Sequence, residues 1–159
     1  MYNPEKPVSR QMIEQYEKYK SSIIGVQEVA KKDVSKYGIV DPGKRLDDKT
    51  VEVEDFVEKP FVEDAPSRFA CLGRYLLDGK IFDHLEDARP GKGGEIQLTD
   101  AILKLQKSGE KVAAYNFEGK RYDIGDKLGL LKANIEYGLK HDETKEGLVE
   151  YLKNELKII

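Results

Sequence analysis

The chain has 159 residues, of which 39% are hydrophobic and 36% are charged, and its formal net charge is −3. That length fits one domain over residues 1–159, and the apolar share is enough to build a hydrophobic core. The small negative charge argues against a nucleic-acid partner or an anionic membrane surface, and no apolar run is long enough to span a bilayer.

The first part of the chain predicts a helix followed by three strands. Residues 9–20 carry apolar side chains on one helical face, and Ser9 stands where an N-cap is expected. Residues 21–29 then switch to β-branched apolar residues, which favours a strand. Residues 37–43 predict a short strand that ends in a Pro-Gly turn, and residues 50–59 predict the next strand.

The second part of the chain continues the mixture of strands and helices. The expected elements are a strand over 69–77 that Gly73 interrupts, helices over 80–88 and 95–107, a strand over 111–117, and helices over 126–140 and 144–157. Ile81, Phe82 and Leu85 are expected to face inward. This mixture predicts the α/β fold class, with a mixed sheet flanked by helices. Residues 91–94 are rich in glycine but do not follow a strand, which disfavours a phosphate-binding loop there.

Glu58-Lys59-Pro60 ends the strand-like run from Val51 and is the most informative motif of the chain. The proline stops the strand ladder because it has no N–H to donate. Glu58 and Lys59 are therefore expected at a strand end, where α/β folds place ligands. The carboxylate of Glu58 suits sugar hydroxyls, and the ammonium of Lys59 suits a phosphate. The alternative is a solvated charge pair at a sheet edge.

Three further segments each have two interpretations. Gly38 lies inside a strand pattern, where glycine marks either the close approach of a ligand or a bulge. Gly93 and Gly94 precede Glu95 at a predicted helix start with free N–H groups, although Glu95 also suits the helix dipole alone. Asp123 lies at a strand-to-helix junction, where it suits either a metal ion or the cap of the next helix.

Five segments carry a specific resemblance. They are Tyr-Gly-Ile-Val at 37–40, Phe-Val-Glu-Lys-Pro at 56–60, Leu-Gly-Arg-Tyr at 72–75, Gly-Gly-Glu-Ile-Gln-Leu-Thr-Asp-Ala-Ile at 93–102 and Phe-Glu-Gly-Lys-Arg-Tyr-Asp-Ile-Gly at 117–125. In the residues of these segments and in their order along the chain, the protein resembles the bacterial UTP–glucose-1-phosphate uridylyltransferases, a branch of the sugar nucleotidyltransferase family. The resemblance runs from about Arg10 to the last helix. The motif Lys-Arg-Tyr-Asp-Ile-Gly favours this branch over the thymidylyl and adenylyl branches.

The resemblance implies part of the nucleotide-diphospho-sugar transferase fold, which is Rossmann-like. Members of this family begin with a strand and a Gly-x-Gly-Thr-Arg loop for the nucleoside triphosphate. They also carry a Leu-Gly-Asp-Asp segment whose aspartate holds magnesium. Neither segment occurs here. The chain is therefore expected to be the second half of such an enzyme, to lack its N-terminal nucleotide-binding half, and to be inactive by itself.

The reaction of this family joins glucose 1-phosphate to UTP, forms UDP-glucose and releases pyrophosphate. Two polyanions must meet, so charge neutralisation and positioning supply most of the catalysis. The resemblance assigns Lys59 to the sugar phosphate as the catalytic residue, Glu58 to the glucose hydroxyls, and Gly38 to a backbone N–H beside the sugar. UTP would be bound mainly by the missing half, so the choice of base rests on resemblance alone.

The resemblance also implies Mg²⁺ as the cofactor. Asp123 would be the second magnesium ligand, beside the aspartate of the missing half, and oxygen ligands suit this cation. Gly73 is expected to line the sugar pocket, and Glu95 is expected to stabilise its wall.

Two other interpretations stay open. One is another sugar-1-phosphate nucleotidyltransferase, of thymidylyl or adenylyl type. The other is a non-catalytic interaction module, because the helices of residues 126–159 carry apolar stripes that suit packing against another subunit. Leu148, Leu152 and Leu156 form one such stripe, and a homo-oligomer is expected on these grounds.

The remaining chemistry-bearing residues fit structural roles. Cys71, the only cysteine, lies in an apolar stretch, is expected to be a small core residue and allows no internal disulfide. His84 and His141 are too few and too far apart for a zinc site or a catalytic triad. No signal-peptide core follows Met1, so we expect a soluble, cytoplasmic protein.

Overall fold

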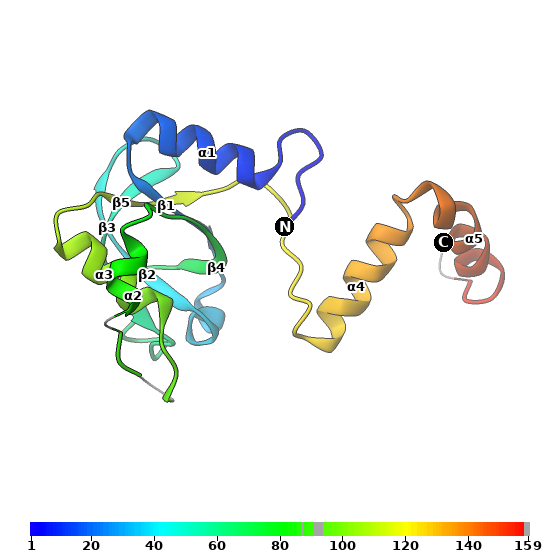
Figure 1. The fold of residues 1–159 in the computed structure, drawn as a ribbon. Coiled ribbons are helices and arrows are strands. Elements are labelled where there is room, and N and C mark those ends of the chain that lie inside the picture. The colour runs from blue at the N-terminus through cyan, green and yellow to red at the C-terminus, as the bar shows by residue number, and fades with distance from the viewer. Residues whose placement is uncertain (87, 91–93, 158–159) are drawn as a thin grey trace. The chain divides into compact units, whose positions relative to one another are not determined.

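The computed structural model describes residues 1–86, 88–90 and 94–157. Contacts between residues divide the chain into two compact units, and Figure 1 follows the chain through both. The larger unit comprises residues 3–118, and the C-terminal unit comprises residues 119–157 together with Met1 and Tyr2. None of the described helices is long and apolar enough to cross a membrane.

Apart from the short 3₁₀ helix η1, which the sequence pattern did not predict, the larger unit contains strands and helices in the predicted order. They are α1 (Val8–Tyr19), β1 (Ser22–Glu28), the short 3₁₀ helix η1 (Lys31–Lys36), β2 (Gly38–Arg45), β3 (Thr50–Glu58), β4 (Phe69–Leu76), α2 (Ile81–Glu86), α3 (Leu98–Lys107) and β5 (Val112–Asn116). The strands form one sheet that closes on itself in the order β1-β4-β2-β3-β5. Strands β1 and β5 run parallel, whereas the other described pairs are antiparallel. The prediction of a mixed sheet with flanking helices is confirmed.

The main hydrophobic core joins the sheet to α2 and α3. Ile24, Val40 and Val53 from three different strands are buried in it together with Ile102 and Leu105 of α3. The predicted apolar stripe on α3 is therefore confirmed. Removing large aliphatic side chains from water is the main contribution that holds such a helix on a sheet.

Helix α2 is shorter than the helix predicted over 80–88. Ile81 is buried and Leu85 packs against the main core, as expected. Phe82 is 67% exposed, so the prediction that it faces inward is wrong. Residues four apart share a helix face, whereas Phe82 is turned about 100° away from Ile81 around the axis.

The predicted N-cap of α1 and the predicted end of β2 are also wrong, because the backbone conformation there differs from what the local sequence pattern indicates. Helix α1 begins at Val8 with Pro7 as its N-cap residue, so Ser9 is not the cap. Strand β2 continues through Pro42 to Arg45 instead of turning at the Pro-Gly pair. Its register with β3 is irregular around Pro42, which is where a residue without an N–H is tolerated in a strand.

Gly73 produces the predicted interruption of β4. Gly25 of β1 pairs with Arg74, but the next β1 residue, Val26, pairs with Cys71, so two residues of β4 are left without a partner. Gly73 has a φ of +71°, which favours glycine over any residue with a Cβ. The strand is therefore bulged at this glycine.

The C-terminal unit consists mainly of α4 (Lys127–Gly138) and α5 (Asp142–Asn154). Asp126 caps α4 by accepting a hydrogen bond of 2.8 Å from the Gly129 N–H. Along the predicted stripe of α5, Leu152 is buried, but Leu156 lies beyond the helix and is 46% exposed. The stripe is therefore shorter than predicted.

Candidate functional site

The Glu58-Lys59-Pro60 motif lies where the β2–β3 ladder ends. Gly38 opens β2 and pairs with Glu58, the last residue of β3, and the Lys59 N–H donates to the Tyr37 carbonyl at 3.1 Å. A Cβ on Gly38 would lie only 2.8 Å from Oε2 of Glu58. The structure thus brings Gly38 and Glu58 together, and the absence of a side chain at position 38 leaves room for the carboxylate.

A pocket of about 270 Å³ opens beside this pair. The residues that line it come from η1, β2, β3, β4 and the start of α3: Lys36, Tyr37, Gly38, Glu58, Cys71, Tyr75, Gln97, Leu98 and Thr99. Two of the predicted site residues, Gly38 and Glu58, are among them. We call this hollow the Glu58 pocket.

Lys59 lies beside the Glu58 pocket and is not among its lining residues. It is exposed and has a φ of +46°. A left-handed conformation costs a non-glycine residue about 1 kcal/mol, and Pro60 adds a further restriction by disfavouring the right-handed helical region for Lys59. The backbone hydrogen bond to Tyr37 holds this bend in place.

Gly73 does not line the Glu58 pocket, but Cys71 and Tyr75 on either side of it do. Nothing lies within 4 Å of the position that a Cβ of Gly73 would occupy. Burial, and after it the Glu58 carboxylate, raises the pKa of Cys71 to about 12. Burial, Cys71 and Glu58 raise the pKa of Tyr75 to about 12. Both groups are therefore protonated at neutral pH, and Tyr75 presents a neutral hydroxyl.

Glu95 is exposed and lies three residues before α3, which begins at Leu98. The expected helix start at Glu95 is therefore wrong, and Gln97 and Thr99 line the Glu58 pocket instead of Glu95. The acidic residue in the first turn of α3 is Asp100. The predicted glycine-rich loop covers residues 91–94, of which residues 91–93 lie outside the described residues.

Asp123 belongs to the C-terminal unit and is exposed. Its carboxylate accepts hydrogen bonds from the Arg121 guanidinium at 2.8 Å and from the Gly125 N–H at 3.2 Å. Within the described part of the chain, no three His, Cys, Asp or Glu side chains are arranged to hold a metal ion. Asp123 thus offers a single carboxylate, and the described residues do not complete a magnesium site.

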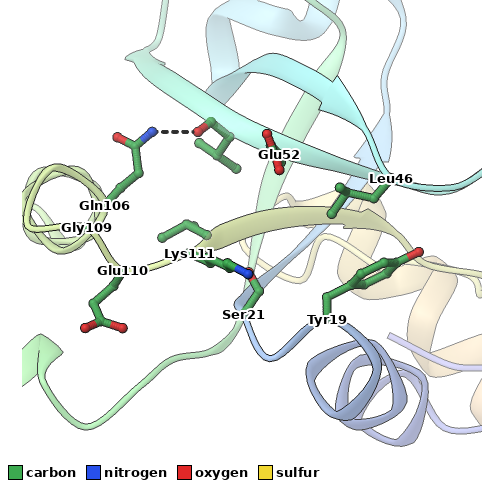
Figure 2. Close-up of a pocket in the computed structure, with 10 residues that line it drawn as sticks. Tyr19, Ser21, Leu46, Glu52, Gln106, Gly109, Glu110 and Lys111 are labelled. Carbon is green, nitrogen blue, oxygen red and sulfur yellow. Dashed lines mark hydrogen bonds between the residues drawn. The ribbon is translucent and has the colours of Figure 1, made fainter.

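A second hollow, of about 330 Å³, lies near the other end of α3 (Figure 2). Its residues include Tyr19, Ser21, Glu52 and Lys111, and Gln106 is anchored there by donating to the Val53 carbonyl at 2.8 Å. This hollow is larger than the Glu58 pocket, but none of the predicted site residues lines it. Size alone therefore does not mark it as the functional site.

Sequence reasoning missed several residues of the Glu58 pocket, among them Lys36, Tyr75 and Thr99. The available signal was position: Lys36 directly precedes Tyr37-Gly38, and Thr99 lies in the Gly-Glu-Ile-Gln-Leu-Thr-Asp segment. Cys71 was expected to be a core residue. It packs against the main core and also lines the pocket.

Comparisons with known proteins agree on one family. The chain is 49% identical over 149 residues to UTP–glucose-1-phosphate uridylyltransferase 2 of Staphylococcus saprophyticus, covering 94% of this chain and 51% of that protein. A solved structure of UDP-glucose pyrophosphorylase with UDP-glucose matches with a TM-score of 0.80 and 44% identity, over 87% of this chain and 52% of that one. The UTP-bound enzyme of Acinetobacter baumannii matches with a TM-score of 0.84 and 35% identity, over 98% and 53%.

The chain spans about half the length of the curated relatives that it matches. The model of the nucleotidyl transferase family matches residues 6–139, which include the Glu58 pocket and Asp123. On this evidence the chain belongs to the nucleotidyl transferase family.

Proposed function

We propose that this chain provides the sugar-phosphate half of a UTP–glucose-1-phosphate uridylyltransferase. The observation that carries the proposal is the pairing of Glu58 with Gly38 at the mouth of a pocket, in a chain whose relatives carry that enzyme's name. In this role the chain binds glucose 1-phosphate and the glucose part of UDP-glucose. UTP binding depends mainly on sequence that this chain does not contain.

In this proposal Glu58 binds the sugar and Lys59 binds its phosphate. The Glu58 carboxylate accepts hydrogen bonds from glucose hydroxyls, and the Gly38 backbone lets the sugar approach closely. Lys59 neutralises the sugar phosphate, whose oxygen attacks the α-phosphorus of UTP while pyrophosphate leaves. Glu95 and Gly73 act indirectly, because Glu95 precedes α3 and Gly73 bends β4 beside the pocket.

The proposed cofactor is Mg²⁺, with Asp123 as one of its carboxylate ligands. A carboxylate oxygen is the kind of donor that Mg²⁺ prefers, and the ion supplies charge neutralisation when bound. Asp123 alone does not make a site. The proposal therefore needs further ligands from outside the described residues, and no step is assigned to the ion.

Binding of glucose 1-phosphate by the purified chain tests the proposed function. We expect the backbone amide resonances of Gly38 and Glu58 to move during an NMR titration with this ligand. Glu58→Gln should weaken binding about tenfold, because a neutral amide replaces the charged carboxylate that accepts the hydrogen bonds. Glu54→Gln, on the same strand but outside the Glu58 pocket, is the matched control.

The same samples show whether the chain is catalytic by itself. With UTP and Mg²⁺ added, we expect binding of glucose 1-phosphate without release of pyrophosphate. Absence of any shift at Gly38 and Glu58, or equal shifts in wild type and Glu58→Gln, would contradict the sugar-phosphate assignment. Pyrophosphate release would contradict the assignment of UTP binding to another half. Use of dTTP or ATP by the complete enzyme would favour the thymidylyl or adenylyl alternative.

Self-association through α4 is a second proposed property. Leu128, Leu131 and Ile135 recur at helical spacing on α4 and are between 44% and 58% exposed. Apolar surface of this kind is characteristic of contact sites, and the proposed occupant is a second copy of the chain.

Sedimentation velocity over a range of protein concentrations tests this self-association. We expect a monomer–dimer equilibrium that Leu131→Glu shifts to the monomer, because the change places a charge in an apolar contact. Lys132→Gln, one position along the helix, should leave the equilibrium unchanged. A wild-type chain that stays monomeric at every concentration would contradict self-association through α4.

A further inference from the structure

The charged residues that line the Glu58 pocket do not include Lys59, the residue to which the resemblance assigns the sugar phosphate. Among the described residues that line the pocket, Glu58 is the anion and Lys36 is the cation. Lys59, to which the resemblance assigns the phosphate, lies outside this lining. A sugar phosphate that occupied the pocket would therefore meet Lys36 as well as Glu58.

The topology explains why Lys36 and Lys59 lie at the same end of the ladder. Gly38 pairs with Glu58, and the Lys59 N–H bonds to the Tyr37 carbonyl, so the chain segments before Gly38 and after Glu58 run side by side. Lys36 is the last residue of η1 and directly precedes Tyr37. Two lysines therefore flank the Glu58 carboxylate, and Asp33, which pairs with Lys36, brings the sum of these four charges to about zero. Release of Lys36 from Asp33 would make a second cation available to a phosphate.

The Lys36 ammonium has a partner that a phosphate can replace. It forms an ion pair of 2.7 Å with Asp33, three residues earlier, and its side chain is 63% exposed. The hydrogen bond from Lys36 lowers the pKa of Asp33, so the carboxylate is ionised at neutral pH. Exposed ion pairs of this spacing contribute little to stability, whereas a phosphate dianion offers stronger acceptors.

We propose that Lys36 is a second phosphate-binding residue of the Glu58 pocket, exchanging its ion pair with Asp33 for the phosphate of the bound sugar phosphate. The inference rests on the proposed function and deepens it. Lys36 contacts the phosphate alone, and Glu58 contacts the sugar. Asp33 competes with the ligand for the ammonium, so it weakens binding of sugar phosphates and has no effect on a sugar without phosphate.

Titrations of the purified chain with glucose 1-phosphate and with glucose, followed by NMR, test this assignment. Lys36→Met should weaken binding of glucose 1-phosphate about tenfold, and Lys36→Arg should restore most of it. Asp33→Asn should strengthen it about twofold. Binding of glucose should be the same in all three variants. Lys31→Met, at the first residue of η1 and outside the pocket lining, is the control.

The variants of Lys36 and Glu58 separate the two proposals. If Glu58→Gln weakens binding and Lys36→Met does not, or Lys31→Met weakens it equally, the role of Lys36 is overturned and the proposed function stands. If Lys36→Met weakens binding of glucose as strongly as that of glucose 1-phosphate, Lys36 supports the pocket and does not bind phosphate. If the wild-type chain binds neither ligand, the proposed function is overturned together with the role of Lys36.

Discussion

Gly38→Ala should abolish detectable binding of glucose 1-phosphate while leaving the fold intact. The new Cβ would lie 2.8 Å from Oε2 of Glu58, which is closer than carbon and oxygen can pack. The Glu58 carboxylate is the end of a flexible side chain, so it can move aside. We therefore expect the free energy of unfolding to change by less than about 1 kcal/mol, but Glu58 would leave the position from which it is proposed to bind the sugar.

Two measurements check this prediction. An NMR titration with glucose 1-phosphate reports binding, and urea denaturation reports the free energy of unfolding. Gly79→Ala is the matched control, because nothing lies within 4 Å of its Cβ position and its φ is not in the left-handed region. Binding by Gly38→Ala within twofold of wild type would show that the Glu58 carboxylate does not need its present position.

Gln11→Ala should cause the largest loss of stability among single substitutions outside the apolar core. Gln11 is 3% exposed, and its side-chain amide joins α1 to the end of β5. Nε2 donates to the carbonyls of Lys6 and Glu118, both at 2.8 Å. Oε1 accepts from the Glu118 N–H at 2.9 Å and from the Tyr115 hydroxyl at 3.2 Å.

Removing this amide leaves the buried Tyr115 hydroxyl without this partner, and the Lys6 carbonyl and the Glu118 N–H lose theirs in partly buried places. Each unsatisfied buried group costs about 1–3 kcal/mol, so we expect the free energy of unfolding to fall by about 3 kcal/mol. Urea denaturation followed by circular dichroism measures the loss. Gln15→Ala on the same helix removes a single acceptor, for the Thr50 hydroxyl at 3.3 Å, and should cost about 1 kcal/mol or less. Equal losses in the two variants would contradict the bridging role of Gln11.

Local periodicity was enough to predict the strands and α-helices, because each depends on side chains close together in sequence, whereas the 3₁₀ helix η1 was missed. The α3 stripe of Ala101, Ile102 and Leu105 follows from helical spacing alone, and all three side chains are buried. Errors arose where a boundary depended on something other than this pattern. Strand β2 continues past Pro42 because β3 still pairs with it on the far side of an irregularity.

Closure of the sheet was not predictable from the sequence, because it depends on pairings between strands far apart in the chain. Strand β5 pairs with β1 on one side and with β3 on the other. No local composition distinguishes such a closed sheet from an open one, since the strands have the same alternation in both. The closure is a property of register and twist.

For the candidate site, the sequence by itself determined the strand-end motif at Glu58-Lys59-Pro60 and the family, and it predicted a role for Gly38 beside the sugar, which stays a prediction. These rest on short segments whose residue order is specific. Only the tertiary structure decided which side chains surround Glu58. Register places Gly38 against its carboxylate, and the bulge at Gly73 leaves Cys71 and Tyr75 on the pocket wall while Gly73 itself lies outside it. The physical reason is that a pocket wall is assembled from several elements, and their positions follow from strand pairing and packing.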